Sequence, residues 1–189
     1  MAYWHGPSPF SLPEFLPPLN LPPRRVKPLV AAAHGATAFV GHELFLAADV
    51  RVAARDTQFS QAEVTRGLFP AGGGTVRFTR EAGWGNAMRY ILTGDAWNAD
   101  EAYRMGLVQA VTAPGKEFDR AVELARKIAA AAPLGVRASL ASANQALASN
   151  EATAYAALSA TLGRLFQTED AREATRAGEE RRAPVFQGR

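Results

Sequence analysis

The stretch from His34 to Gly74, which reads HGATAFVGHELFLAADVRVAARDTQFSQAEVTRGLFPAGGG, decides the fold of this chain. It contains two glutamates, Glu43 and Glu63, and each stands beside glycine-rich chain that can turn tightly. Two carboxylates that reach one pocket from separate elements can serve as acid and base in the same reaction. The stretch therefore predicts an enzyme that moves protons.

The residues around the first glutamate predict alternating strands and helices. Residues 29–33 form a short apolar run between Pro28 and Gly35, which is typical of a buried strand. A glycine-punctuated turn and a helix over residues 41–48 come next, and residues 50–54 read as a second strand. A strand, a tight turn and a helix start direct free helix N–H groups toward a ligand.

The rest of the chain is mostly helical in pattern. We expect short helices over residues 85–93 and 99–105, a strand over 107–111, and longer helices over 118–131, 134–147, 152–167 and 169–181. With 189 residues and 48% hydrophobic content, the chain is long enough for one sizeable core. The pattern predicts one α/β domain, over residues 28–189, with C-terminal helices from about residue 134.

Residues 1–27 differ in composition from the rest of the chain. Residues 1–28 hold eight of the twelve prolines, which largely bars regular helix or central strand there. We expect a proline-rich, extended and partly ordered arm. Its aromatic and leucine content is too apolar for a solvated linker, so we expect it to pack on the domain or on a neighbouring subunit.

Composition excludes several classes of function. A formal charge of only +3 is too small to indicate nucleic-acid binding, although it suits an anionic ligand. The chain has no cysteine and three histidines without paired helical spacing, so we expect no metal site. No apolar run is long enough to cross a bilayer and no signal sequence is present, so we expect a cytoplasmic protein that does not bind membranes.

Several motifs, in the right order, resemble those of the enoyl-CoA hydratase/isomerase (crotonase) family. AFVGHEL, around Glu43, occupies the place of the family's LGGGCEL, and FSQAE, residues 59–63, that of FGQPE. FPAGGG stands for IPGAGG. Residues 93–111 and 168–189 are similar to the family's TGxxxxAxEAxxxGLVxxV stretch and its TEDxxEGxxAFxEKRxPxFxG ending. The resemblance runs from Lys27 to the last residue and implies the crotonase fold, the ββα-spiral shared with ClpP.

The resemblance also implies roles for individual residues. Glu43 and Glu63 would be the catalytic acid and base. The Val40 N–H would be an oxyanion donor, with Gly41 and Ala71 as further oxyanion or substrate-binding positions. Phe39 and Val40 replace family glycines, and a β-branched residue tolerates unusual φ angles poorly. Valine can still supply the donor if the backbone keeps its shape.

Other conspicuous residues have ordinary structural interpretations. We expect His42 to be a packing or surface residue, and Gly72 to Gly74 to form a tight turn beside the pocket. Core packing is the ordinary explanation for Trp84 and Trp97.

The family's N-terminal strands and FxAGxD-like loop, which supplies the first oxyanion donor, have no counterpart before Lys27. The chain therefore looks like a member without that section. Retention of both acids implies addition of water to trans-2-enoyl-CoA thioesters, with no cofactor besides the CoA of the substrate. An isomerase or another acyl-CoA activity of the family stays open, as does an impaired member that only binds CoA or oligomerises. The family also implies a homo-oligomer, a trimer or hexamer.

Overall fold

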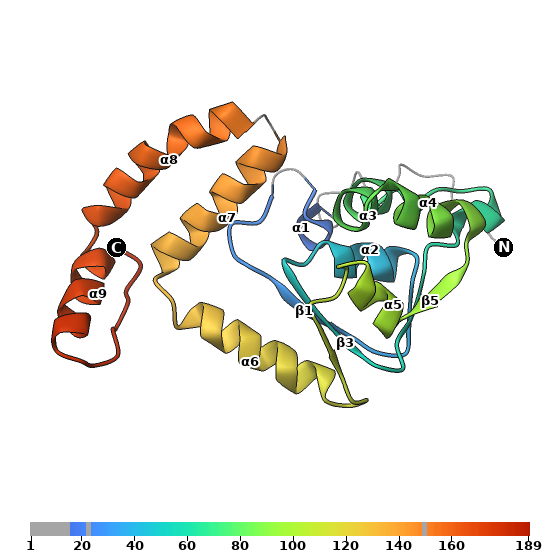
Figure 1. The fold of residues 1–189 in the computed structure, drawn as a ribbon, viewed down its shortest axis with the longest axis horizontal. Helices are drawn as coiled ribbons and strands as arrows, with labels where there is room; N and C mark the ends of the chain where they lie inside the picture. Colours follow the sequence, from blue (N-terminus) through green and yellow to red (C-terminus); the bar gives the residue numbers. More distant parts are fainter. Residues whose placement is uncertain (1–15, 22–23, 149–150) are drawn as a thin grey trace. The chain divides into compact units, whose positions relative to one another are not determined.

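The computed structural model describes residues 16–21, 24–148 and 151–189 of the chain (Figure 1). The chain forms two compact units, one of residues 1–25 and 29–123 and the other of residues 26–28 and 124–189. Every predicted site residue belongs to the first unit. The division into an arm over 1–27 and a domain over 28–189 stays a prediction.

Two small sheets form the frame of the first unit. One is parallel throughout and has the order β1-β3-β6: β1 (Val30–Ala33), β3 (Val50–Ala54) and β6 (Ala110–Thr112). The other has the order β2-β4-β5, with β2 and β4 parallel and β4 and β5 antiparallel: β2 (Ala36–Ala38), β4 (Gln58–Ser60) and β5 (Ala96–Asn98). Only His34 and Gly35 separate β1 from β2, and Gly35 has φ 59°, so the chain turns sharply from one sheet into the other.

The central strand β3 agrees with the prediction for residues 50–54. Four of its five residues are buried, as expected of a central strand in a parallel sheet. Residues 107–111 were expected to form a strand, but β6 begins only at Ala110. Leu107 and Val108, just before it, are buried in the core. Their apolar character reflects packing rather than strand pairing.

Five short helical elements surround these sheets: α2 (Val40–Leu46), η2 (Glu63–Arg66), α3 (Gly74–Ala82), α4 (Trp84–Thr93) and α5 (Ala99–Arg104). Helix α2 contacts β1, β2 and α3 (Figure 1). The Asn98 side chain caps α5 by accepting from the Glu101 N–H at 2.9 Å. Helix α3 was not predicted, because it starts in a glycine run and has no side-chain cap. The only helical signal in its sequence is the four-residue spacing of Gly74, Phe78 and Ala82, which are the buried residues of the helix.

An aromatic cluster fills the core of the first unit. The ring of Trp97 lies 4.6 Å from that of Tyr90 and 5.1 Å from that of Phe78, centroid to centroid. The core prediction for Trp97 is thus confirmed. For Trp84 it is wrong, because this side chain is 74% exposed. Trp84 begins α4, and the buried side of the helix starts one turn later, at Ala87.

The described part of the N-terminal region contains one short helix. The expectation that prolines bar helix there is wrong for α1 (Leu16–Leu19), in which Pro17 and Pro18 occupy the first turn. Proline is tolerated in that turn because the first N–H groups of a helix have no partner within it. Leu19 is fully buried, as expected for an arm that packs on the domain. Residues 1–15 and 22–23 lie outside the described residues.

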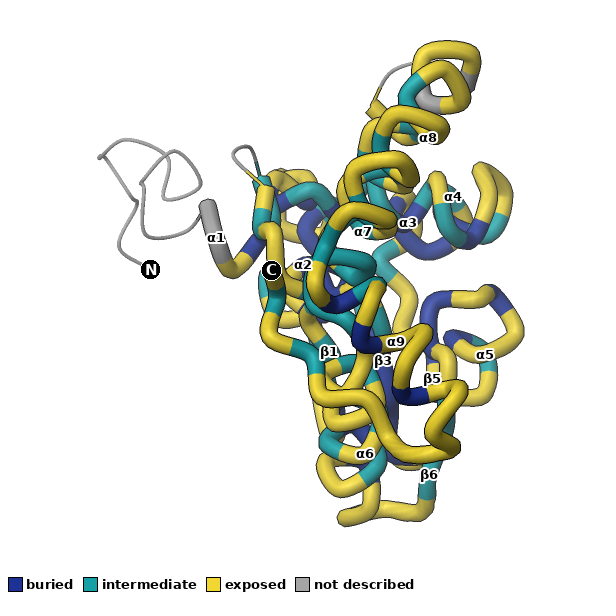
Figure 2. Tube along the Cα trace, turned by 90° about the vertical axis from the view of Figure 1, so that its left-hand side faces the viewer, coloured by how far each residue is buried: buried dark blue, intermediate teal, exposed yellow. Residues whose placement is uncertain are grey.

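The second unit is helical. Helix α6 (Glu117–Ala129) carries the boundary between the units, and α7 (Pro133–Ala148), α8 (Glu151–Phe166) and α9 (Glu169–Glu179) come after it. All four were predicted to within two residues at each end. Helices α7 and α8 contact each other, and Figure 2 shows them almost wholly in the colours of exposed and intermediate residues. The Asp170 carboxylate of α9 accepts from the N–H groups of Gln187 and Gly188, at 2.7 and 2.8 Å, and so fastens the C-terminal tail.

Candidate active site

Glu43 stands in the first turn of α2, and its side chain is only 1% exposed. The carboxylate Oε1 accepts a hydrogen bond from the Gly74 N–H at 2.8 Å. This contact joins the helix of the first glutamate to the start of α3. The glycine loop therefore supplies a main-chain donor that stabilises the ionised form of Glu43.

Two glycines make room for that carboxylate. A Cβ atom on Gly72 would lie 2.7 Å from Glu43 Oε2, and one on Gly74 would lie 3.0 Å from Oε1. A Cβ on Gly74 would also overlap the Gln61 side chain. Gly73 has φ 101°, which residues with a side chain rarely adopt. Each glycine thus has its own physical reason, and the predicted tight turn beside the pocket is present.

Glu63 is the first residue of the 3₁₀ turn η2, and its side chain is only 8% exposed. Its Oε2 is buried and has no hydrogen-bond partner among the described residues. Burial raises the pKa of Glu63, and the hydrogen bond from its own backbone N–H and, after it, the charge of Arg66 partly offset that rise. A carboxyl with a free, buried oxygen is well suited to hold a proton.

The two glutamates interact electrostatically. Burial is the main cause of the raised pKa of Glu43, and the charge of Glu63 raises it further. The N–H groups of Gly74 and Gly72 and the positive charge of Arg77 act in the opposite direction. Buried carboxyls with raised pKa values are typical of acid and base catalysts.

The turn before α2 carries backbone strain, but at Phe39 rather than at Val40. Phe39 has φ 55° and ψ −131°, a conformation that favours glycine and costs about 1–3 kcal/mol in other residues. Val40 is not among the residues with positive φ and begins the helix normally. As the first residue of α2, Val40 has an N–H without an acceptor inside the helix. The valine therefore keeps its proposed donor available, and the concern about its branched side chain was misplaced.

Gln61 is a site residue that the sequence did not single out. Its side chain is fully buried, and its Nε2 donates to the Phe39 carbonyl at 3.0 Å. The Phe39 N–H in turn donates to the Ser60 carbonyl at 3.2 Å. The FSQAE segment thus holds the strained turn in place. The glutamine in that motif was the signal that could have identified this role.

Gly41 and Ala71 occupy more open positions. Gly41 is exposed and lines a cavity of about 310 Å³ with residues of β1, β2 and α2, including Ala31, Thr37 and Phe45. Neither glutamate lines this cavity. Ala71 is exposed, next to Gly72. Glu43 interacts electrostatically with Glu63, and the FSQAE segment contacts the turn directly before Val40. Their catalytic and binding roles remain predictions.

His42 is buried beside the site and has a packing role, as expected. Its ring lies 5.1 Å from that of Trp97 and 5.6 Å from that of Phe59. Burial, and secondarily the charge of Arg51, lowers the pKa of His42 to about 3. The imidazole is therefore neutral at physiological pH.

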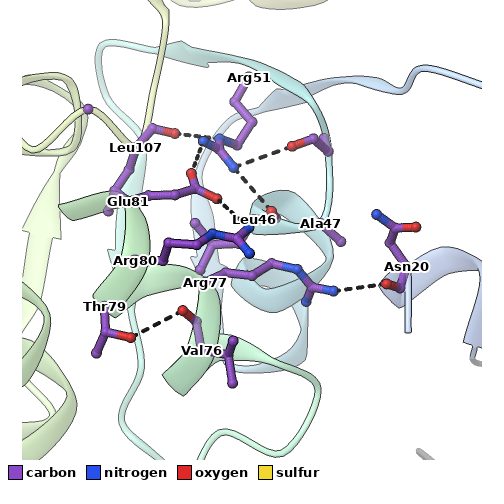
Figure 3. Close-up of polar contacts among 12 residues, drawn as sticks. Asn20, Leu46, Ala47, Arg51, Val76, Arg77, Thr79, Arg80, Glu81 and Leu107 are labelled. Atoms are coloured by element: carbon purple, nitrogen blue, oxygen red, sulfur yellow. Dashed lines mark hydrogen bonds and ion pairs between the residues drawn. The ribbon is translucent and has the colours of Figure 1, made fainter. Parts of the chain in front are cut away.

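Two arginines behind α2 hold the elements of the site in place (Figure 3). Arg51 donates to the carbonyls of Leu46 at 3.1 Å and Leu107 at 2.6 Å, and it pairs with Glu81 of α3. Arg77 donates to the Gly72 carbonyl at 3.0 Å and to the carbonyl of Leu19. Arg51 thus connects α2 to α3, and Arg77 connects α3 to α1 and to the glycine turn.

Two other kinds of feature are missing from the described residues. Within those ranges, no three His, Cys, Asp or Glu side chains gather as metal ligands would. None of the helices there is long and apolar enough to span a membrane. A cytoplasmic location stays a prediction.

Comparisons with known proteins agree with this geometry. The enoyl-CoA hydratase/isomerase family model matches residues 23–189. The short-chain-enoyl-CoA hydratase of Clostridium acetobutylicum is 38% identical over 156 residues, which are 82% of this chain and 60% of that protein. The crotonyl-CoA hydratase of Syntrophomonas wolfei is 36% identical over 85% of this chain and 62% of its own length.

Solved structures agree as well. The crystal structure of a probable enoyl-CoA hydratase/isomerase from Mycobacterium abscessus has a TM-score of 0.89 at 44% identity, over 91% of this chain and 67% of the other. An enoyl-CoA hydratase from Mycobacterium tuberculosis has a TM-score of 0.85 at 39% identity, over 90% and 67%. The chain spans 60 to 62% of the length of the first curated relatives that it matches. The predicted crotonase fold is confirmed, and the chain belongs to the enoyl-CoA hydratase/isomerase family.

Proposed function

We propose that this protein adds water across the double bond of trans-2-enoyl-CoA thioesters. The observation that carries the proposal is the pair of buried carboxyls, Glu43 and Glu63, whose pKa values are both raised. Two acids in this state can give and take protons on either side of one bond without a metal. The reaction needs no cofactor besides the CoA that the substrate carries.

The two acids have different surroundings and therefore different proposed roles. Glu43 accepts the Gly74 N–H, which favours its ionised form, so Glu43 takes the proton from water. The water oxygen bonds to the β-carbon while the double-bond electrons move toward the thioester oxygen. Glu63, with its unpartnered oxygen, gives its proton to the α-carbon. One water is added in total, and a proton passing from Glu43 to Glu63 restores the starting state.

The negative charge that forms on the thioester oxygen needs hydrogen-bond donors. The Val40 N–H at the start of α2 is the proposed donor, and the positive end of the helix adds to its effect. Removal of one such donor typically lowers the rate of an enzyme by about 10² to 10³.

Hydration of crotonyl-CoA tests the proposal directly. The purified chain should remove the conjugated-enoyl absorbance, and Glu63→Gln should lower that rate by about 10² to 10⁴. Glu123→Gln, an exposed acid on α6, is the matched control and should leave the rate unchanged. A folded protein without turnover would instead indicate a member that only binds CoA. Product analysis with 2-enoyl and 3-enoyl thioesters separates hydration from isomerisation.

We also propose that the protein is a homo-oligomer, a trimer or hexamer as in the family it belongs to. Support comes from α7 and α8, whose described residues include no buried one. Large side chains such as Tyr155, Leu162 and Phe166 are more than half exposed on α8. Such a surface favours association between chains. Light scattering after size-exclusion chromatography would give the subunit number, and a monomer at micromolar concentration would contradict the proposal.

A further inference from the structure

Phe39 connects the two halves of the candidate site. It lies between β2 and α2 in a backbone conformation that favours glycine, directly before the Val40 N–H. A residue with a side chain keeps such a conformation only where its surroundings enforce it. The contacts of Phe39 therefore show what maintains the shape of the turn.

Three contacts reach Phe39 from the segment that carries Glu63. Two involve its main chain, namely the bond from its N–H to the Ser60 carbonyl and the bond from the Gln61 side chain to its own carbonyl. The third involves its ring, because the Arg66 guanidinium carbon lies 4.3 Å from the ring centroid. The main-chain bonds are open to any residue at position 39. The stack requires an aromatic ring and a cation.

Arg66 is also close to Glu63. It ends the 3₁₀ turn that Glu63 begins, three residues later, and its charge acts on the Glu63 carboxyl. The other charged group that interacts with this carboxyl is Glu43 of α2. Helix α4 packs against η2, and its one charged residue, Arg89, lies over Tyr90 instead.

Arg66 has no other evident structural task. In the described part of the chain its guanidinium makes no hydrogen bond or ion pair, and the side chain is exposed. An exposed arginine that serves only solubility would have no reason to lie over the one strained aromatic residue of the site.

We propose that Arg66 is a positioning residue for hydration: its guanidinium holds the Phe39 ring, and with it the turn that presents the Val40 N–H, and it places a positive charge beside Glu63. This inference rests on the function proposed above. Arg66 itself touches no reacting atom. Its effect passes through the geometry of the turn and through the acidity of Glu63.

The test compares Arg66→Leu, Arg66→Lys and Phe39→Leu with the matched control Arg89→Leu. Arg89 also lies over an aromatic ring, at 5.1 Å from the centroid of Tyr90, but away from the glutamates. The measurements are kcat and KM for crotonyl-CoA, the pH profile of kcat/KM, and the titration of the Glu63 carboxyl by carbon-13 NMR. Thermal unfolding of each variant establishes that it is folded.

We expect Arg66→Leu to lower kcat about 10-fold with little change in KM. The Phe39 turn loses its contact with the guanidinium, and Glu63 becomes a weaker acid. Without the positive charge Glu63 keeps its proton to higher pH, so the alkaline limb of the profile should move up by ~0.3–1 pH unit. Arg66→Lys should keep the limb and lose part of kcat. Phe39→Leu should lower kcat without moving the alkaline limb. When Arg66→Leu and Phe39→Leu are combined, the loss of kcat should be smaller than the sum of the two single effects on a free-energy scale.

Two results would overturn the inference. One is an Arg66→Leu enzyme with the same kcat and the same alkaline limb as Arg89→Leu. The other is a Glu63 titration that is identical in Arg66→Leu and the parent protein. These failures are distinct from failure of the proposed function, in which the parent chain itself has no turnover. In that case the catalytic role of Arg66 fails as well, even if the NMR titration of Glu63 shifts.

Discussion

Replacing Gly72 by alanine crowds the Glu43 carboxylate without disturbing the backbone, because Gly72 does not have a positive φ. The new Cβ would lie 2.7 Å from Oε2 and 3.0 Å from Cδ of Glu43, and 3.1 Å from Leu19 Cδ2. Ordinary contacts begin at 3.4 Å, so the carboxylate has to retreat by about 0.7 Å. That movement would weaken its hydrogen bond to Gly74.

The expected cost comes from the crowding. Overpacking of this kind destabilises a folded protein by about 1–3 kcal/mol. Alanine also lowers the conformational entropy of the unfolded chain relative to glycine, which stabilises the folded state by about 0.4–1 kcal/mol. A net loss of about 1–2 kcal/mol corresponds to a fall in Tm of roughly 2–8 °C for a protein of this size. Misplacement of a catalytic group by nearly 1 Å should lower kcat by about 10- to 100-fold.

Circular dichroism on heating and the crotonyl-CoA assay measure the two effects. Gly85→Ala is the matched control, because a Cβ there meets nothing within 4 Å and lies in helix α4. A Gly72→Ala protein with the Tm and kcat of the control would refute the reasoning about the glycine cradle. A lower Tm with unchanged kcat would remove Glu43 from the mechanism.

Three further variants test other parts of the molecule. Between pH 7 and 5 the parent protein should lose more stability than the His42→Phe variant. Burial holds the pKa of His42 at about 3 in the folded protein, so only the unfolded chain gains a proton there below pH 6.5. The difference in the free energy of unfolding approaches ~1.4 kcal/mol per pH unit, and equal losses of Tm would contradict the prediction. In urea unfolding, Arg51→Met should cost roughly 1–3 kcal/mol for each buried carbonyl that it leaves unpaired, whereas Glu81 keeps its ion pair with Arg80. The exposed Arg55→Met should cost under ~1 kcal/mol, and similar costs would refute the buried network. Asp170→Asn should speed amide exchange at Gln187 about 10-fold, and an unchanged rate would mean that other contacts hold the tail.

Local elements agree with local patterns. Residues 50–54 form the predicted strand because their mostly apolar side chains suit a strand buried on both faces, and the one charged side chain, Arg51, is buried with hydrogen-bond partners. Asn98 and Thr168 each accept the backbone N–H three residues on, and so start their helices where the sequence indicates. Helix α3 was not predicted because it starts in a glycine run, and these glycines accommodate the Glu43 carboxylate rather than favour a helix.

The sequence by itself determined the family, singled out the two candidate acids and placed the central strand and the C-terminal helices, because motif spacing and periodicity are properties of neighbouring residues. Only the tertiary structure decided why Gly72 and Gly74 are glycines, since the Glu43 carboxylate that they accommodate comes from about 30 residues away. The same holds for Phe39, whose strain is balanced by Gln61 and Arg66 across the turn. Hydrogen bonds, steric overlap and ring stacking depend on distances in space, and the order of residues fixes these distances only through the whole fold.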